Sequence, residues 1–263
     1  MRIGLIGAGN MARALARGWG EPVICSDGGS GRAAELAAEL GGEAVFSNRE
    51  VAERVDLVVL CHKPAQLEQV AREIHGVAKA VASVLGATST GALQACYPNT
   101  PVFALMPNTP VEVRRGVICY AERPPSPAAN ASVADPELEP QVLELFGRLG
   151  TVVRVPERLF DAATAISGVG PAYQALLVEA QVDAAVRHGL PAALAGELIV
   201  ETLSGTAALL SHRGHDTLAV RREVTSPGGS TARGLAALEA AGVRSAFQAA
   251  MDAVVRLPAA GST

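Results

Sequence analysis

The fold of this chain follows from one stretch, Arg2-Ile3-Gly4-Leu5-Ile6-Gly7-Ala8-Gly9-Asn10-Met11-Ala12. Its first half is apolar and predicts a buried β-strand, and the residues from Ala12 to Trp19 predict a helix. The turn between them reads G-x-G-x-x-A, in which the first glycine makes a tight turn and the second lets a pyrophosphate approach the backbone. With a strand before it and a helix after it, the motif predicts that a dinucleotide cofactor binds at Gly7, Ala8, Gly9, Asn10 and Met11.

Strands and short helices alternate from this stretch onward. The predicted strands are 2–6, 23–26, 44–46, 56–61, 80–84, 102–106, 117–120 and 151–155, and the predicted helices are 12–19, 32–40, 48–53, 64–75, 90–96 and 140–149. This alternation is typical of an α/β fold with a mainly parallel, doubly wound sheet of the Rossmann type. We predict a dinucleotide-binding domain over residues 1–157, in which the proline-rich residues 122–140 form a surface loop.

The end of the second predicted strand carries the residues that choose between the two nicotinamide nucleotides. Asp27 lies 20 positions after Gly7, where an acidic residue usually binds the adenosine ribose of NAD. Ser26, Ser30 and Arg32 surround it in a glycine-rich loop, and hydroxyls beside a guanidinium suit the 2′-phosphate of NADPH. The alternative for Arg32 is a solvated residue that opens the next helix. The sequence therefore leaves NADPH and NADH both open.

Ligands of doubly wound sheets bind outside the carboxyl ends of the strands, which directs attention to two further loops. His62, Lys63 and Pro64 follow the fourth predicted strand, and we expect this loop to contact the ribose or the phosphates of the cofactor. A plain loop histidine and a solvated lysine are the alternative. Met106 and Asn108 follow the sixth strand, where neighbouring prolines stiffen the chain and the Asn108 amide is expected to hold the nicotinamide or a substrate ring. A plain turn is again the alternative.

The second part of the chain is rich in alanine and leucine at helical spacing. Helices are predicted at 172–188, 191–212, 217–223, 231–241 and 243–257, which makes residues 158–263 an all-helical domain. Several of these helices are apolar on more than one side. A domain of about 100 residues cannot bury all of this apolar surface within itself. We therefore expect this domain to pack against a second subunit and to form a homodimer or a higher homo-oligomer.

Within the helical part lies a second glycine-rich stretch, Thr225-Ser226-Pro227-Gly228-Gly229-Ser230-Thr231. Pro-Gly-Gly ends any preceding helix, and Ser230 or Thr231 is expected to cap the next one with its side-chain oxygen. Adjacent glycines leave backbone N–H groups unscreened at the positive end of that helix, where a small carboxylate can bind. The stretch predicts an anion cup, and an ordinary capped turn is the alternative.

Composition excludes several classes of protein. With 49% apolar and 18% charged residues the chain is globular, and a net charge of −4 without basic runs gives no reason to bind nucleic acid. No uninterrupted apolar run reaches the roughly 18 residues that span a bilayer, so no membrane partner is expected. The four cysteines and five histidines lack metal-ligand spacing, so we expect reduced thiols, no metal and a cytoplasmic protein.

Taken together, the motifs resemble those of the pyrroline-5-carboxylate reductases. The matching segments are Gly7 to Ala12, Lys63-Pro64, Met106 to Pro110, Gly168 to Tyr173, Val224 to Thr231, Gly234-Leu235 and Leu238-Glu239. They extend over almost the whole chain. Met-Pro-Asn-Thr-Pro combined with Thr-Ser-Pro-Gly-Gly is specific to this family, whereas the glycine turn is shared with many dehydrogenases.

The resemblance implies an enzyme that reduces the cyclic imine 1-pyrroline-5-carboxylate to L-proline with NADPH or NADH, the last step of proline biosynthesis. It implies a substrate site between the nucleotide domain of one subunit and a helical domain at the dimer interface. The substrate carboxylate would lie on Gly229, Ser230 and Thr231, within a cup that also includes Ser226 and Gly228. The Thr231 hydroxyl would reach the ring nitrogen, which makes Thr231 the expected catalytic residue.

Relatives usually carry a serine near the substrate where this chain has Val169. This departure keeps two alternatives open: a reductase of another imine or of a 2-keto acid on the same scaffold, and a non-catalytic relative that binds a dinucleotide. The intact stretch from Thr225 to Thr231 argues against the non-catalytic alternative, because a protein freed from its substrate has no need of an anion cup.

Overall fold

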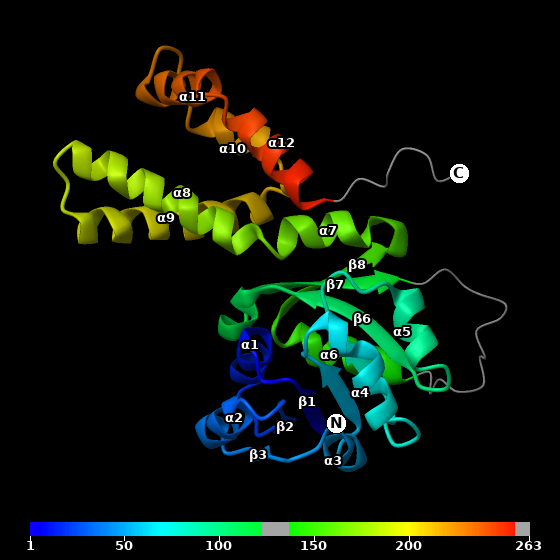
Figure 1. The fold of residues 1–263 in the computed structure, drawn as a ribbon. Helices are drawn as coiled ribbons and strands as arrows, with labels where there is room; N and C mark the ends of the chain where they lie inside the picture. Colours follow the sequence, from blue (N-terminus) through cyan, green and yellow to red (C-terminus); the bar gives the residue numbers. More distant parts are fainter. Residues whose placement is uncertain (123–136, 256–263) are drawn as a thin grey trace. The chain divides into compact units, whose positions relative to one another are not determined.

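The computed structural model describes residues 1–122 and 137–255. The chain divides into two compact units, Met1–Pro171 and Ala172–Thr263. Most of the predicted proline-rich loop lies outside the described residues, as does the predicted end of the last helix. The first unit is α/β and the second is helical, as the sequence predicts (Figure 1).

The first unit is built on one eight-stranded sheet with the strand order β3-β2-β1-β4-β5-β6-β7-β8. The strands are β1 (Ile3–Ile6), β2 (Ile24–Ser26), β3 (Glu43–Ala44), β4 (Leu57–Leu60), β5 (Val81–Ser83), β6 (Val102–Pro107), β7 (Gly116–Glu122) and β8 (Gly150–Pro156). All neighbouring pairs are parallel except β6 and β7. The carboxyl ends of β1 to β4 therefore meet at one edge, where ligands bind in this class of sheet.

Helices cover both faces of this sheet, because residues in the central strands point alternately to the two sides. Leu5 and Val59 belong to one buried cluster and Ile6 and Leu60 to the other. The first cluster contains side chains of α1 (Asn10–Trp19), α2 (Arg32–Leu40) and α6 (Leu138–Gly147). The second contains side chains of α3 (Asn48–Arg54), α4 (Leu67–Glu73) and α5 (Thr90–Cys96). Two short 3₁₀ turns, η1 (Pro64–Gln66) and η2 (Thr109–Val113), follow β4 and β6.

The compact first unit extends beyond the boundary at residue 157 that the end of the last strand predicts. After β8 the chain forms η3 (Glu157–Leu159) and α7 (Phe160–Ser167), and α7 contacts β7 and β8. Ala165 of α7 is buried in this arrangement. The division between the units thus falls at Pro171, because α7 packs on the sheet although its sequence is as helical as that of α8.

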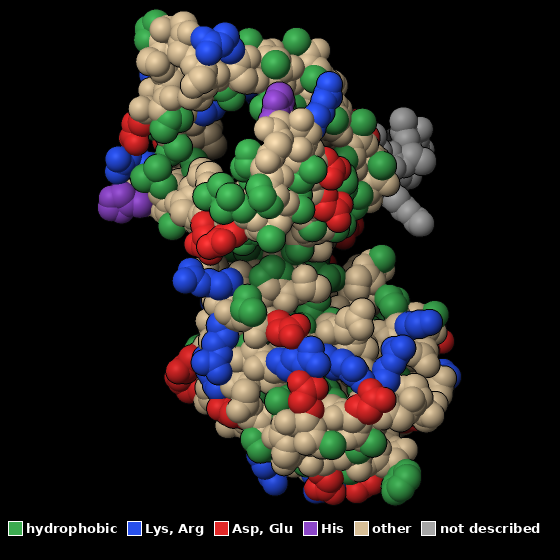
Figure 2. All heavy atoms as spheres, turned by 90° about the vertical axis from the view of Figure 1, so that its left-hand side faces the viewer, with side chains coloured by type: hydrophobic (Ala, Val, Ile, Leu, Met, Phe, Trp, Pro, Cys, Tyr) green, Lys and Arg blue, Asp and Glu red, His purple; other side chains and the backbone are tan. Residues whose placement is uncertain are grey.

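In its described residues, the second unit consists of five helices with little buried surface of their own. They are α8 (Gly170–Arg187), whose first two residues belong to the first unit, α9 (Ala192–His212), α10 (Thr217–Glu223), α11 (Ser230–Ala240) and α12 (Val243–Val254). Figure 2 shows apolar side chains spread over the surface of these helices. The exposed large residues include Leu176, Leu194, Leu198, Val200 and Leu203.

Within the described part of the chain, α9 is the one helix that is long and apolar enough to cross a membrane by length and composition. Only 6% of its apolar window is buried inside the structure. The sequence expectation of no spanning run counted only uninterrupted apolar residues, and α9 carries Glu197 and Glu201 within its apolar length.

Candidate functional site

The glycine turn after β1 requires glycine at its first position for two reasons. Gly7 has φ 99°, a conformation that L side chains rarely adopt. A Cβ atom at Gly7 would lie 2.7 Å from the carbonyl carbon and oxygen of Cys61 and from the amide nitrogen of His62. The Gly7 N–H donates to the carbonyl oxygen of Ser26 at 2.9 Å, which fixes the turn against β2.

The second glycine of the motif, Gly9, keeps the space beside the turn open for a ligand. A Cβ atom at Gly9 would meet nothing within 4 Å, so the space beside it is free. Gly9 is the N-cap of α1 and no side chain caps this helix. The N–H groups of the first helical turn consequently keep their hydrogen-bonding capacity for a ligand, and the positive end of the helix favours an anion such as a pyrophosphate.

A groove of about 840 Å³ opens at the carboxyl ends of β1 to β4. Eight of the residues that the sequence singles out line it: Gly7, Ala8, Gly9, Asp27, Ser30, Arg32, His62 and Lys63. The volume lies in the range of small-molecule and cofactor sites. Four loops that are distant in sequence thus contribute to one site, because parallel strands end at the same edge of the sheet.

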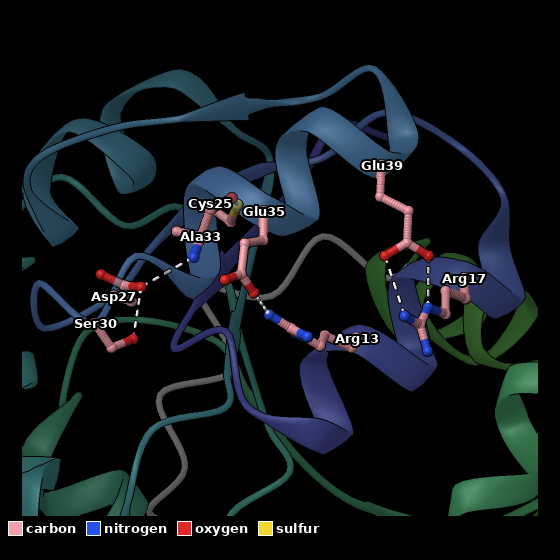
Figure 3. Close-up of polar contacts among 8 residues, drawn as sticks. All are labelled: Arg13, Arg17, Cys25, Asp27, Ser30, Ala33, Glu35 and Glu39. Carbon is pink, nitrogen blue, oxygen red and sulfur yellow. Dashed lines mark hydrogen bonds and ion pairs between the residues drawn. The ribbon is translucent and has the colours of Figure 1, made fainter.

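Asp27 organises its own loop. Its carboxylate accepts hydrogen bonds from the Gly29 N–H at 2.8 Å, the Ser30 hydroxyl at 2.8 Å and the Ala33 N–H at 2.9 Å. Figure 3 shows the contacts with Ser30 and Ala33. Burial by itself raises the pKa of Asp27, but the bonds from Ala33, Ser30 and Gly29 outweigh it and the pKa is lowered. The charged carboxylate therefore shapes the loop and caps the start of α2, which carries Arg32.

Ion pairs tie α2 to α1. Arg13 pairs with Glu35, and the Arg17 Nε lies 2.6 Å from Glu39 Oε1 (Figure 3). Both pairs are partly exposed, so their individual contributions to stability are small. Their positions along the two helices fix α2 relative to the glycine turn.

His62 presents an unpartnered nitrogen in the wall of the groove. Its Nδ1 lies 2.9 Å from the carbonyl oxygen of Lys63, so the neutral ring donates through Nδ1 and leaves Nε2 as an acceptor. The Nε2 atom is buried and has no hydrogen-bond partner. Burial lowers the pKa of His62, although the Lys63 carbonyl and Glu73 oppose the shift. A buried acceptor without a partner is costly unless a ligand supplies a donor, which fits a cofactor with ribose hydroxyls and amides.

Beneath the groove runs a chain of polar side chains. Ser26 is fully buried, and its hydroxyl donates to Asn48 Oδ1 at 2.7 Å. Asn48 Nδ2 in turn donates to Glu73 Oε2 at 2.5 Å. Asn48 and Glu73 line the groove, whereas Ser26 lies behind them. In this structure the Ser26 hydroxyl holds Asn48, and its contact with a phosphate stays a prediction.

The other predicted cofactor residues, Asn10, Met11, Pro64, Met106 and Asn108, lie outside the groove lining. Asn108 is 8% exposed, and its amide is engaged at both ends. Its Oδ1 accepts from the Val117 N–H at 2.8 Å, and its Nδ2 donates to the Ser167 carbonyl oxygen at 3.0 Å. In the first unit, Asn108 therefore joins β7 to α7.

Several groove residues escaped sequence reasoning. Phe46 and Arg49 follow the short strand β3, and Gln66 and Gln69 follow β4; all four line the groove. The signal that points to them is their position close after the carboxyl ends of β3 and β4, at the ligand-binding edge. No sequence motif marks them.

The glycine-rich stretch of the second unit starts α11 in a different way from the sequence expectation. The N-cap of α11 is Gly229, and no side chain caps the helix, so the predicted cap by Ser230 or Thr231 is wrong. Gly228 has φ 68°, which brings the chain into the turn one residue earlier than a capping serine would. Ser230 and Thr231 then belong to the first helical turn. No side chain caps the N–H groups of that turn, so they keep the hydrogen-bonding capacity that the predicted anion cup requires.

Around this cup the chain is held by local bonds. The Gly229 N–H donates to the Ser226 carbonyl oxygen at 3.1 Å, and Arg233 Nη1 donates to the Gly228 carbonyl oxygen at 2.8 Å. The Arg233 guanidinium adds positive charge beside the start of α11. Val169 lies apart from this stretch in the sequence, in the two-residue link between α7 and α8, and is half-buried.

A mainly parallel sheet with a glycine turn, an uncapped first helix and a groove across four strand ends is the arrangement of a dinucleotide-binding protein. Residues 2–86 match a family model described as NADP oxidoreductase, coenzyme F420-dependent, and residues 157–258 match one described as pyrroline-5-carboxylate reductase dimerisation. The chain belongs to the pyrroline-5-carboxylate reductase family.

Individual relatives support this assignment over the full length. A pyrroline-5-carboxylate reductase from Synechocystis sp. is 36% identical over 265 residues, which are 97% of this chain and 96% of that protein. The crystal structure of the enzyme from Streptococcus pyogenes has a TM-score of 0.85 at 28% identity, covering 97% of this chain and 96% of that one. The Plasmodium falciparum structure, with NADP bound, has a TM-score of 0.83 at 27% identity and covers 97% and 95%.

Proposed function

We propose that this protein reduces 1-pyrroline-5-carboxylate to L-proline with NADPH. The observation that carries the proposal is the uncapped start of α11 behind two glycines, in a chain that belongs to this family over its whole length. The anion that such a start accepts is the carboxylate that the substrate and the product share. The nucleotide groove of the first unit supplies the place for the reductant.

Each part of the cup has a role in this reaction. The N–H groups at Ser230 and Thr231 hold the carboxylate, with Ser226, Gly228 and Gly229 shaping the turn, in which the Gly229 N–H is bonded to the Ser226 carbonyl oxygen. The Thr231 hydroxyl is directed to the ring nitrogen and orients the imine. A cyclic imine is basic enough to arrive protonated, so these residues need only bind and orient it. NADPH, when bound, would supply the hydride, so the reaction needs no buried general acid from the protein.

Different residues of the groove bind different parts of the nucleotide. Gly9 and the start of α1 hold the pyrophosphate, and Ser30 and Arg32 hold the 2′-phosphate that distinguishes NADPH. Support for this division comes from Asp27, whose carboxylate is occupied by its own loop and is less available to ribose hydroxyls. NADH remains a weaker alternative reductant. His62 and Lys63 contact the ribose and the phosphates from the other side of the groove.

The helical unit serves assembly. Exposed leucines and valines on α8 and α9 support a homodimer or higher oligomer of this chain, and Glu197 and Glu201 within α9 favour a protein partner over a bilayer. Nucleic acid plays no part, and the working place of the enzyme is the cytoplasm.

The first experiment mixes purified protein with NADPH or NADH and 1-pyrroline-5-carboxylate and follows loss of the reduced nicotinamide absorbance. Fast, imine-dependent oxidation with a preference for NADPH is expected, with proline as the product. Nucleotide binding without oxidation would contradict the proposal. Val169 then favours another imine or a 2-keto acid, which the same assay tests by exchanging the substrate.

A further inference from the structure

Phe46 is the most exposed large apolar residue of the described chain, with a relative exposure of 104%. Exposing a phenyl ring forgoes the free energy that burial of its apolar area would give. The ring nevertheless does not lie on a loose segment. A ligand that covers the ring would recover this free energy.

The backbone on both sides of Phe46 is fixed. Val45 is buried, and its N–H donates to the Cys25 carbonyl oxygen at 2.9 Å. On the other side Ser47 caps α3, with its Oγ accepting from the Glu50 N–H at 3.1 Å. Phe46 lies at a bend between these two fixed residues, and its side chain is left exposed there. The exposed ring is thus a consequence of two anchored neighbours.

Phe46 lines the same groove as the glycine turn and the Ser30–Arg32 loop. It follows β3, which lies two strands away from β1 in the sheet. Two strand spacings are about 10 Å. In a dinucleotide whose pyrophosphate lies at Gly9, the adenine lies one ribose further out, on the side of β2 and β3. A flat apolar surface at this end of the groove faces the flat end of the nucleotide.

We propose that Phe46 is the platform on which the adenine ring of the nucleotide stacks. The proposal rests on the proposed use of NADPH. The phenyl ring supplies an apolar, polarisable face, and adenine supplies its partner face. Arg32 at the start of α2 and Arg49 in the first turn of α3 also line the groove, and Arg32 supplies positive charge for the 2′-phosphate.

The test measures binding of NADPH and of 2′,5′-ADP to the whole protein by calorimetry, without any imine. Phe46→Ala is expected to weaken both ligands by the same factor, about 5-fold or more, since removing an aromatic platform costs about that much or more per base. Phe46→Trp is expected to bind both normally, with its indole fluorescence quenched by 2′,5′-ADP. Thermal unfolding is expected to be unchanged, because the ring is exposed.

Val113→Ala is the matched control, because Val113 is also exposed in the first unit, at 69%, but lies outside the groove lining. It is expected to leave both affinities unchanged. If Phe46→Ala binds 2′,5′-ADP as tightly as the unmodified protein does, the proposal is overturned, even if its affinity for NADPH falls. The titrations contain no imine, so they test the role of Phe46 even if the protein does not reduce the imine. If the unmodified protein does not bind NADPH, both the proposed function and the role of Phe46 are overturned.

Discussion

The two units of this protein are both rich in apolar residues, but they use them differently. Among the described residues, all buried apolar side chains except Ala195 and Val220 lie in the first unit. That unit packs helices on both faces of its sheet and so closes its own core. The helices of the second unit leave leucines and valines exposed. Apolar content alone therefore does not make a core, because a second layer is required.

The largest predicted effect concerns self-association, and it comes from changing the exposed apolar face of α9. Leu194 and Leu198 are four residues apart on one helical face and are 46% and 51% exposed. We expect the double variant Leu194→Glu, Leu198→Glu to weaken self-association more than about 100-fold, since a buried leucine contributes about 1.5–3 kcal/mol. Light scattering after size-exclusion chromatography measures the mass.

Val113→Glu is the control for that experiment, because it places the same charge on an exposed apolar position of the first unit. Its assembly is expected to match that of the unmodified protein. A double variant that keeps its full mass would exclude this face of α9 from the interface.

The two glycines of the turn provide a second contrast, inside the first unit. Gly7→Ala brings a Cβ against the backbone of Cys61 and His62 at positive φ, so we expect roughly 2 kcal/mol or more of lost stability. Gly9→Ala meets no atoms within 4 Å and is expected to fold normally, with NADPH binding weakened about tenfold or more. Denaturant unfolding and calorimetry separate the two effects. Equal stability of the two variants would contradict the assigned role of Gly7.

Arg32 tests the nucleotide choice of the first unit. Arg32→Ala is expected to raise the KM for NADPH about tenfold and to leave the KM for NADH unchanged, because a charged hydrogen bond to a phosphate contributes about 1.5–3 kcal/mol. Steady-state kinetics with both nucleotides give the ratio. An unchanged NADPH/NADH ratio would remove Arg32 from the phosphate site.

Thr231 tests the second unit in the complementary way. Thr231→Ala is expected to raise the KM for the imine about fivefold, the size of one neutral hydrogen bond, and to leave the KM for NADPH unchanged. Thr231→Ser keeps the hydroxyl and is expected to restore imine binding. Equal changes for imine and nucleotide in Thr231→Ala would contradict the assignment of Thr231 to the substrate.

The smallest effect is expected at His62, whose pKa is lowered mainly by burial. The folded protein holds fewer protons on this ring than the unfolded chain, so stability falls as the pH drops below about 6.5, the ordinary histidine pKa. His62→Asn is expected to make this loss on the acid side shallower and to leave stability at neutral pH nearly unchanged. Urea unfolding across this pH range checks it. A steeper acid loss in the variant would reverse the sign of the argument.

Sequence reasoning found the parts of the site that local geometry dictates. The glycine turn, the alternation of strands and helices and the start of α11 follow from residue types at fixed spacing. Eight predicted cofactor residues line one groove because the order of strands brings their loops to one edge. Ser26 and Asn108 were assigned to the ligand because they are polar and follow strands. In the structure their side chains bond Asn48, Val117 and Ser167, which are distant in sequence, and their contacts with a ligand stay predictions.

The fold class, the glycine turn and the family were settled by the sequence alone. These three features depend on backbone conformation and on hydrophobic periodicity, and both are determined by residues that are close in sequence. Tertiary packing was needed to show that Ser26 and Asn108 bond residues distant in sequence and that Phe46 stands exposed in the groove. Hydrogen-bond partners and burial depend on which distant segments meet, and that is fixed when the sheet and its helices pack.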